Sequence, residues 1–171
     1  MIKPYKGIFP KIHSTAFIED SAQIIGDVEI GEDSSIWFNT VVRGDVHYIR
    51  IGNKTNIQDG SIIHVTNSLC PTIVEEEVTV GHGVILHGCV VRKRSLIGMG
   101  AIIMDNVIVG NDCIVAVGSV VSENTVIEPG WLVMGIPAKP KRMLKEEEKE
   151  RILRSANNYV EYKNTYLTFT I

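Results

Sequence analysis

The chain has 171 residues, and its 17 Lys and Arg against 20 Asp and Glu leave a formal net charge of −3. This length suits one domain with a sizeable core, and the nearly balanced charge argues against a nucleic-acid partner. The amino-terminal residues lack the apolar core of a signal peptide, and no stretch reaches the roughly 18 uninterrupted apolar residues of a membrane span. We therefore expect a single domain, residues 1–171, in a cytoplasmic protein that binds neither nucleic acid nor membranes.

A six-residue repeat runs through most of the chain, and each hexad begins with an aliphatic residue. The hexads begin at Ile18, Ile24, Ile30, Ile36, Val42, Ile51, Ile57, Ile63, Val74, Val80, Leu86, Val91, Ile97, Ile103, Val109, Val115, Val121 and Ile127. In this kind of repeat one hexad is a short strand plus a corner, and three hexads make a triangular coil. We predict an all-β fold, a parallel β-helix shaped as a triangular prism over about residues 12–135.

The fifth residue of each hexad is small or β-branched, because its side chain also points into the narrow prism. One step of five residues leads from Leu86 to Val91, and two longer irregular steps, of nine and eleven residues, follow Val42 and Ile63. In the hexads that begin at Val42 and Ile63 we assign the fifth position to Val46 and Asn67. After Ile127 the Gly and Pro spacing of PGWLVMGIPAKPKR predicts a loop that leaves the prism.

A carboxy-terminal α-helix is predicted over about residues 144–166. Glu147 with Arg151 and Glu150 with Arg154 have the i,i+4 spacing of favourable ion pairs. One stripe of the helix should pack on the prism, and it consists of Ile152, Ala156, Tyr159, Val160 and Lys163. The end of the chain, residues 168–171, is not assigned to any element.

Counting hexads places three polar residues in one column on one face of the prism. Arg43, His64 and His87 each follow a hexad start by one residue, in hexads that differ by three. Adjacent coils lie about 4.8 Å apart, and imidazole nitrogens bind zinc at about 2.0–2.1 Å. The two histidines are therefore predicted to reach the same metal ion.

A second column lies on the adjacent face, where Asp59 and His82 each come two residues after a hexad start. A corner separates the two columns, so one prism cannot bring them together. A cyclic trimer can, because a head-to-tail interface presses one face of each chain against the adjacent face of the next. We predict a metal held by His64 and His87 of one chain and His82 of its neighbour, with an open position for water.

Other polar residues have simpler interpretations. His13 and His47 are interpreted as solvated histidines. The RGD sequence of Arg43 to Asp45 is either a surface turn or part of an ion pair across the trimer interface, opposite Asp59 of a neighbour, and we favour the ion pair. For Tyr159, helix statistics alone favour packing over catalysis.

Four motifs resemble the γ-class carbonic anhydrase family of bacteria and archaea. They are RGD at residues 43–45, NIQDG at residues 56–60, His64, and GHGVILHGC at residues 81–89. The resemblance extends over nearly the whole chain, including GIPAK at residues 135–139 and the carboxy-terminal helix.

The resemblance implies a left-handed β-helix that forms a homotrimer, with a metal ion shared between adjacent chains. It implies His64, His82 and His87 as ligands of Zn²⁺, with Fe²⁺ or Co²⁺ as alternatives. Gln58 is similar to the glutamine that orients the bound solvent in that family. The active-site residues that it implies are Arg43, Asp45, Asn56, Gln58, Asp59 and Tyr159.

The function implied is the reversible hydration of CO₂ to bicarbonate by a metal-bound hydroxide. The family's acidic loop with its proton-shuttle glutamate is shortened here to NSLCPTIVEEE, and Val46 stands where the prototype has a second glutamate. No proton shuttle is assigned. Three alternatives remain open: an acyl-CoA thioesterase that uses the same site, a metal-free acyltransferase with a histidine base, and a non-catalytic metal-stabilised trimeric scaffold.

Overall fold

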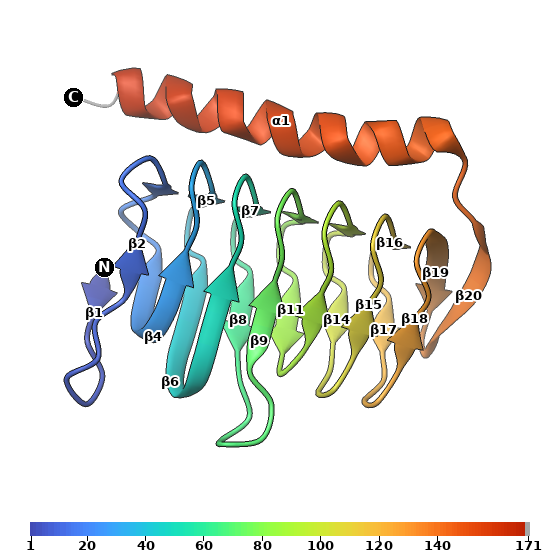
Figure 1. Ribbon diagram of the computed structural model, residues 1–171, viewed down its shortest axis with the longest axis horizontal. Helices are drawn as coiled ribbons and strands as arrows, with labels where there is room; N and C mark the ends of the chain where they lie inside the picture. Colours follow the sequence, from blue (N-terminus) through green and yellow to red (C-terminus); the bar gives the residue numbers. More distant parts are fainter. Residues whose placement is uncertain (170–171) are drawn as a thin grey trace.

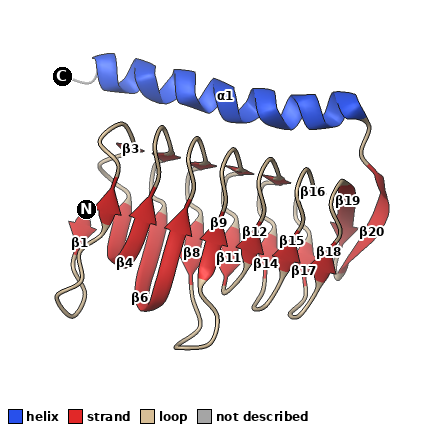
Figure 2. Cartoon of the chain, viewed as in Figure 1, coloured by secondary structure: helices blue, strands red, loops and turns tan. Residues whose placement is uncertain are grey.

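The computed structural model describes residues 1–169, which form a parallel β-helix with one long α-helix alongside it (Figures 1 and 2). The strands stack into three faces. Face A contains β1 (Ile2–Lys3), the first part of β4 (Gln23–Ile30), the first part of β6 (Val41–Ile51), β8 (Ile62–His64), β11 (Ile85–His87), β14 (Ile102–Ile103) and β17 (Val120–Val121). Face B contains β2 (Lys11–Ile12), the second parts of β4 and β6, β9 (Thr72–Val74), β12 (Val90–Val91), β15 (Ile108–Val109) and β18 (Val126–Ile127). Face C contains β3 (Phe17–Ile18), β5 (Ser35–Ile36), β7 (Asn56–Ile57), β10 (Thr79–Val80), β13 (Leu96–Ile97), β16 (Ile114–Val115), β19 (Trp131–Gly135) and, at its edge, β20 (Ala138–Met143).

The aliphatic column of the repeat forms the core of the prism. The hexad starts from Ile24 to Ile127 are each no more than 4% exposed, and Ile18, in the first coil, is partly buried. Full burial of a Val, Leu or Ile side chain contributes about 1.5–3 kcal/mol. The repeat and the β-helix predicted from it are therefore confirmed.

The fifth positions assigned to Val46 and Asn67 were wrong. Val46 is only partly buried and Asn67 is exposed, whereas Ile49 and Thr72 are 0% exposed. Side chains alternate along a strand, so the residue that shares the inward face with a hexad start lies two positions before it. The extra residues of each irregular step therefore leave the prism ahead of Ile49 and Thr72. The longer of these excursions is the loop between β8 and β9 in Figure 1.

The loop predicted after Ile127 is instead an antiparallel hairpin of β19 and β20. β19 continues face C, because Val115 pairs in register with Val133, which is 1% exposed. Val133 is also six residues after Ile127, so the repeat continues for one more hexad. Pro129 and Gly130 occupy the corner between these two hexads and do not end the solenoid.

Helix α1 (Glu146–Phe169) runs back along face C toward the first coil (Figure 1). It begins two residues later than predicted, because the Glu148 carboxylate accepts the backbone N–H of Lys145 at 2.9 Å, as in a capping box. Three helix residues of the predicted stripe, Ile152, Ala156 and Lys163, are buried on the side of α1 that faces the prism. Thr168 and Phe169 belong to the helix, and the other two unassigned residues, 170 and 171, lie outside the described part of the chain.

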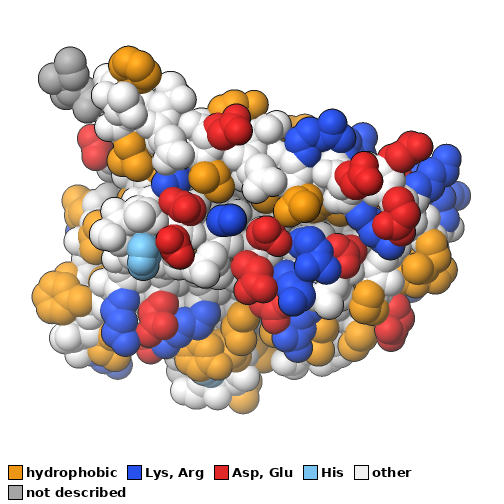
Figure 3. Space-filling model, turned by 45° about the horizontal axis from the view of Figure 1, so that its top comes forward, with side chains coloured by type: hydrophobic (Ala, Val, Ile, Leu, Met, Phe, Trp, Pro, Cys, Tyr) orange, Lys and Arg blue, Asp and Glu red, His pale blue; other side chains and the backbone are white. Residues whose placement is uncertain are grey.

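The ion pairs near the start of α1 differ from those predicted by spacing. Lys149 pairs with Glu146 at 2.7 Å, and Arg142 of β20 pairs with Glu148 at 2.7 Å. Figure 3 shows acidic and basic side chains intermingled over this part of the molecule. In the described residues, no helix is long and apolar enough to span a membrane.

Candidate metal centre

His64 and His87 lie side by side on face A. They are paired in register on neighbouring strands β8 and β11. His64 Nδ1 lies 3.2 Å from His87 Nε2. The column predicted from hexad counting therefore exists in the fold.

Each of these two imidazoles also contacts a carboxylate through its other nitrogen. His64 Nε2 lies 3.1 Å from Asp45 Oδ1, and His87 Nδ1 lies 2.6 Å from Asp105 Oδ1. An ionised carboxylate only accepts hydrogen bonds, so these two nitrogens carry the protons. In neutral imidazoles the remaining nitrogens, which face one another, then both carry lone pairs. Two lone pairs that face each other at 3.2 Å repel, and a cation between them relieves this repulsion.

The spacing of the facing nitrogens fits a bound metal ion. Two nitrogens at about 2.05 Å from a tetrahedral ion are roughly 3.3 Å apart, close to the 3.2 Å observed. Metal-bound histidines also characteristically donate their second N–H to a carboxylate or carbonyl. The donor set is thus suited to a divalent metal.

The environment favours neutral His64 beside an ionised Asp45. Burial lowers the pKa of His64, and the nearby Arg43 charge acts in the same direction, although the bond to Asp45 opposes it. Burial tends to raise the pKa of Asp45, but hydrogen bonds from Arg43 and His64 outweigh it and lower this pKa. Arg43, Gly44 and Asp45 lie within strand β6, so RGD is not a surface turn.

The remaining predicted residues gather near the corner that follows β7 and β10. His82 Nδ1 lies 3.0 Å from Asp59 Oδ2, and both side chains are about half exposed. All three predicted metal ligands therefore have one ring nitrogen beside a carboxylate. By contrast, His13 bonds to Thr15 and His47 Nδ1 accepts the Tyr48 N–H.

Gln58 and Asn56 form a buried amide pair on face C. Gln58 Nε2 donates to Asn56 Oδ1 at 3.0 Å, and Asn56 Nδ2 donates to Thr79 Oγ1 at 3.0 Å. Thr79 Oγ1 in turn donates to Ser155 Oγ of α1 at 3.3 Å. The helix is thereby connected to the amide of Gln58, whose carbonyl oxygen is left as an acceptor.

Tyr159 is half-buried between α1 and face C, with its ring 5.4 Å from that of Trp37 in an edge-on arrangement. Burial raises the pKa of its hydroxyl, and the charge of Asp59 adds to this effect. The tyrosine thus packs as helix statistics suggest and also lies near the corner residues.

The structure therefore divides the predicted site into two groups. The face A group comprises Arg43, Asp45, His64 and His87. The corner group comprises Asn56, Gln58, Asp59, His82 and Tyr159. Within the described residues of this single chain, no three His, Cys, Asp or Glu side chains come close enough to hold a metal together.

Sequence reasoning missed Asp105, which contacts His87, and Thr66, which donates to the other oxygen of Asp105. The repeat count gave no direct signal, because the coil from Leu86 to Ile103 has 17 residues and places Met104, not Asp105, level with His87. Thr79 and Ser155 were missed as well. Their contact depends on how α1 packs on face C, which no repeat count predicts.

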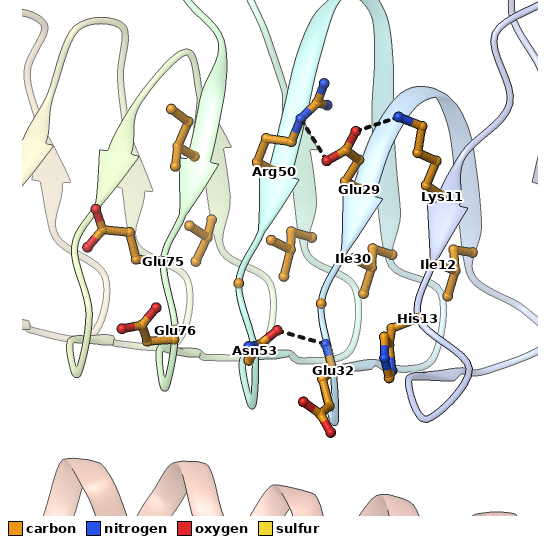
Figure 4. Close-up of a pocket in the computed structure, with 15 residues that line it drawn as sticks. Lys11, Ile12, His13, Glu29, Ile30, Glu32, Arg50, Asn53, Glu75 and Glu76 are labelled. Atoms are coloured by element: carbon orange, nitrogen blue, oxygen red, sulfur yellow. Dashed lines mark hydrogen bonds and ion pairs between the residues drawn. The ribbon is translucent and has the colours of Figure 1, made fainter.

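A surface hollow of about 630 Å³ lies on face B and contains none of the predicted site residues. Figure 4 shows Lys11, Glu29 and Arg50 following one another across neighbouring strands of this hollow. Glu29 pairs with Lys11 at 3.0 Å and with Arg50 at 3.4 Å. Because Glu29 is already paired with Lys11 and Arg50 on an open face, the hollow is a weaker candidate than the histidine pair.

These features define a hexapeptide-repeat β-helix protein with a histidine pair on its prism. The bacterial transferase hexapeptide family model, which describes six repeats, matches residues 9–44. The chain is 54% identical over 166 residues to a Geobacillus kaustophilus protein named carbonic anhydrase, covering 97% of this chain and 91% of that protein. It is 46% identical over 173 residues to protein YrdA of Escherichia coli, covering 98% and 94%.

A solved hexapeptide transferase family protein from Anaplasma phagocytophilum superposes with a TM-score of 0.93 at 41% identity, covering 97% of this chain and 98% of that one. The chain belongs to the hexapeptide-repeat, γ-carbonic-anhydrase-like family. The family resemblance found in the motifs is thereby confirmed.

Proposed function

We propose that this protein is a metal-dependent carbonic anhydrase that reversibly hydrates CO₂ to bicarbonate at the interfaces of a homotrimer. One observation carries the proposal. His64 Nδ1 and His87 Nε2 face each other at 3.2 Å while a carboxylate holds the other nitrogen of each ring. This arrangement directs two lone pairs at one point, where a divalent metal such as Zn²⁺, Fe²⁺ or Co²⁺ would bind.

The third ligand in this proposal is His82 of a neighbouring chain. His82 is about half exposed at the corner beside face A, and Asp59 holds its Nδ1, which leaves Nε2 to bind. Face A also carries a row of aliphatic side chains that point outward from the prism. Ile62 is 45% exposed, and Ile85, Ile102 and Val120 continue the row as partly exposed residues. An apolar row of this kind supports a protein partner on face A.

Arg43 is proposed to meet Asp59 of the neighbouring chain. Within one chain Arg43 pairs with Asp45, but its side chain remains 43% exposed on face A. Its planar guanidinium carries enough donors to serve two carboxylates. The same residue can therefore hold Asp45 beside His64 and contact the next chain.

When bound, a divalent metal at this site supplies Lewis acidity, which in carbonic anhydrase lowers the pKa of water from 15.7 to about 7. Gln58 is proposed to position the reacting water. Its Nε2 is committed to Asn56, so its carbonyl oxygen accepts a hydrogen bond from the water and directs an oxygen lone pair toward the carbon of CO₂. Addition of water to CO₂ releases one proton, which passes to solvent or buffer because no shuttle side chain is assigned.

Metal analysis and CO₂ hydration test this proposal together. Purified protein should hold about one metal ion per chain, and stopped-flow hydration with zinc or with anaerobic iron should exceed the buffer rate. His82→Ala should lose both metal and activity, whereas His47→Ala, which alters a histidine of neither group, should keep both. A hydration rate equal to buffer alone contradicts the proposal, and thioester hydrolysis by the same metal-loaded protein would then favour the thioesterase alternative.

A further inference from the structure

Asp105 is the one carboxylate at the histidine pair that lies outside the motifs described above. It sits at the corner after β14, one coil beyond His87, where Leu86 pairs in register with Ile103. Its Oδ1 lies 2.6 Å from His87 Nδ1, and its side chain is 22% exposed. No residue other than Asp105 forms an ion pair with His87 in the described part of the chain.

Two further residues fix the position of this carboxylate. Thr66 donates its hydroxyl to Asp105 Oδ2 and also lies 3.5 Å from His87 Nδ1. Gly88 provides the space: a Cβ at this position would lie 2.7 Å from Asp105 Oδ1 and 2.7 Å from Cys70 Cβ. A side chain on residue 88 would therefore push the carboxylate away from the ring.

The contact determines which nitrogen of His87 can bind a metal. Because the carboxylate can only accept, it holds the proton on Nδ1 and leaves the lone pair on Nε2. Nε2 is the atom that faces His64. With the opposite tautomer, an N–H would point at the metal position and exclude the ion.

We propose that Asp105 is a positioning residue for the metal ligand His87, holding its ring as the Nδ1–H tautomer, with Thr66 fixing the carboxylate. This inference rests on the metal site of the proposed function and deepens it. It differs from the role of Asp45, which selects the opposite tautomer in His64 by contacting Nε2. The two carboxylates together direct two unlike ring nitrogens at one ion.

Two measurements on the full-length protein test the proposal. The first is the ¹H–¹⁵N spectrum of the histidine rings in metal-free protein, which reports the tautomer of His87. The second is titration with Co²⁺ alone, which reports affinity through its visible absorption. The variants are Asp105→Ala, Asp105→Asn and Thr66→Val. The matched control is Asp112→Asn, which alters another corner aspartate, 24% exposed and paired with Arg94.

In the wild type and in Asp112→Asn, His87 should be the Nδ1–H tautomer. In Asp105→Ala it should shift toward the Nε2–H tautomer, and the Co²⁺ dissociation constant should rise about 10- to 100-fold, the usual range for loss of such a partner. Asp105→Asn keeps an oxygen acceptor and should restore part of the affinity. Thr66→Val should shift both readouts in the same direction by less, and it replaces Asp105→Ala if that variant does not fold.

The proposal would be overturned if Asp105→Ala folds and leaves the His87 tautomer unchanged or the Co²⁺ affinity within twofold of the wild type. If Asp105→Ala does not fold, the same result in Thr66→Val would overturn the proposal. Wild-type protein that binds no Co²⁺ would overturn both this proposal and the proposed function. Wild-type protein that binds Co²⁺ through an Asp105-dependent His87 but hydrates no CO₂ would contradict only the proposed function. The two failures are therefore distinguishable.

Discussion

Replacement of Lys163 by Met should loosen the carboxy-terminal end of α1 from the prism. The Lys163 side chain is only 2% exposed, and its Nζ donates to Thr15 O at 2.8 Å and to Asp33 Oδ1 at 2.7 Å. These bonds join the last turns of α1 to the first two coils. Met keeps the length and apolar stem of Lys, so the substitution removes the charge and its hydrogen bonds with little change in volume.

The magnitude follows from what the substitution leaves behind. A hydrogen bond to a charged group contributes about 1.5–3 kcal/mol, and a fully buried unpaired charge costs more. The Asp33 side chain is 29% exposed, so water can replace part of the lost interaction. The cost of the substitution is therefore expected to be about 1.5–3 kcal/mol and not the larger cost of a fully buried unpaired charge. At about 1.4 kcal/mol per factor of ten, amide exchange in the last turns of α1 should accelerate about 10- to 150-fold.

Native-state hydrogen exchange, read by mass spectrometry of peptides from α1, measures this opening directly. Lys149→Met is the control, because Lys149 pairs with Glu146 at the other end of the same helix, on the surface. Its exchange in the last turns should match the wild type. If Lys163→Met also matches the wild type there, the buried ion pair does not hold α1 in place.

The pH dependence of the same exchange provides a second check. The hydrogen bond from Lys163 lowers the pKa of Asp33, although burial acts against it. A carboxyl whose folded pKa is depressed contributes stability that is present above its unfolded pKa, about 3.9, and lost as the pH falls through the folded value. The protection factors of amides in the last turns, which are corrected for the intrinsic exchange rate at each pH, should therefore fall below about pH 4 in the wild type, with a weaker pH dependence in Lys163→Met.

Three further predictions concern the site and its interface. Thr79→Val removes the partner of Asn56 and should lower kcat for CO₂ hydration by about tenfold, the effect of one lost hydrogen bond, while metal content measured by elemental analysis is unchanged. Gly88→Ala places a Cβ against a carboxylate at a positive φ of 58° and should destabilise the protein by about 1–3 kcal/mol, read as a lower Tm. Ile62→Asp should abolish the trimer in light scattering after gel filtration, whereas Val126→Asp, on face B, should preserve it.

The regular part of the fold could be predicted because each coil repeats one packing problem. A residue such as Ile97 must fill the same space as Val80 and Val115, its neighbours in the stack, so its burial follows from spacing alone. The same periodicity placed His64 beside His87. Prediction failed where chain length departs from the period, because a loop can leave the prism before or after the residue assigned to the core, as at Val46 and Asn67.

Contacts between elements of unlike geometry were not predictable in the same way. Ser155 reaches Thr79 only because α1 packs on face C at a particular rotation, which depends on side chains such as Ile152 and Lys163. Asp105 lies one residue past Met104, the residue level with His87, so the repeat count places it at the corner and not in the histidine column. It was missed because aspartates are common at the corners of this fold, where Asp33 and Asp112 both adopt positive φ.

The prism itself explains why one chain offers only two of three imidazoles. Outward side chains of one column recur once per coil, so two neighbours lie about 4.8 Å apart and can share an ion, but a third lies roughly 10 Å from the first. Beyond His87 the column continues with Met104, level with it on the next coil. Side chains on the next face are turned away by the corner. A three-histidine centre on this scaffold therefore requires a second prism.

In the proposed trimer, metal binding and assembly are then linked reciprocally. A metal that binds His64 and His87 alone gains less free energy than one that also binds His82 of the next chain, and the difference stabilises the interface. The tautomers selected by Asp45, Asp59 and Asp105 favour both processes at once, because in each neutral ring they direct the lone pair toward the metal position before the chains meet. The carboxylates, which bind no metal themselves, would thus determine how strongly the metal holds the trimer together.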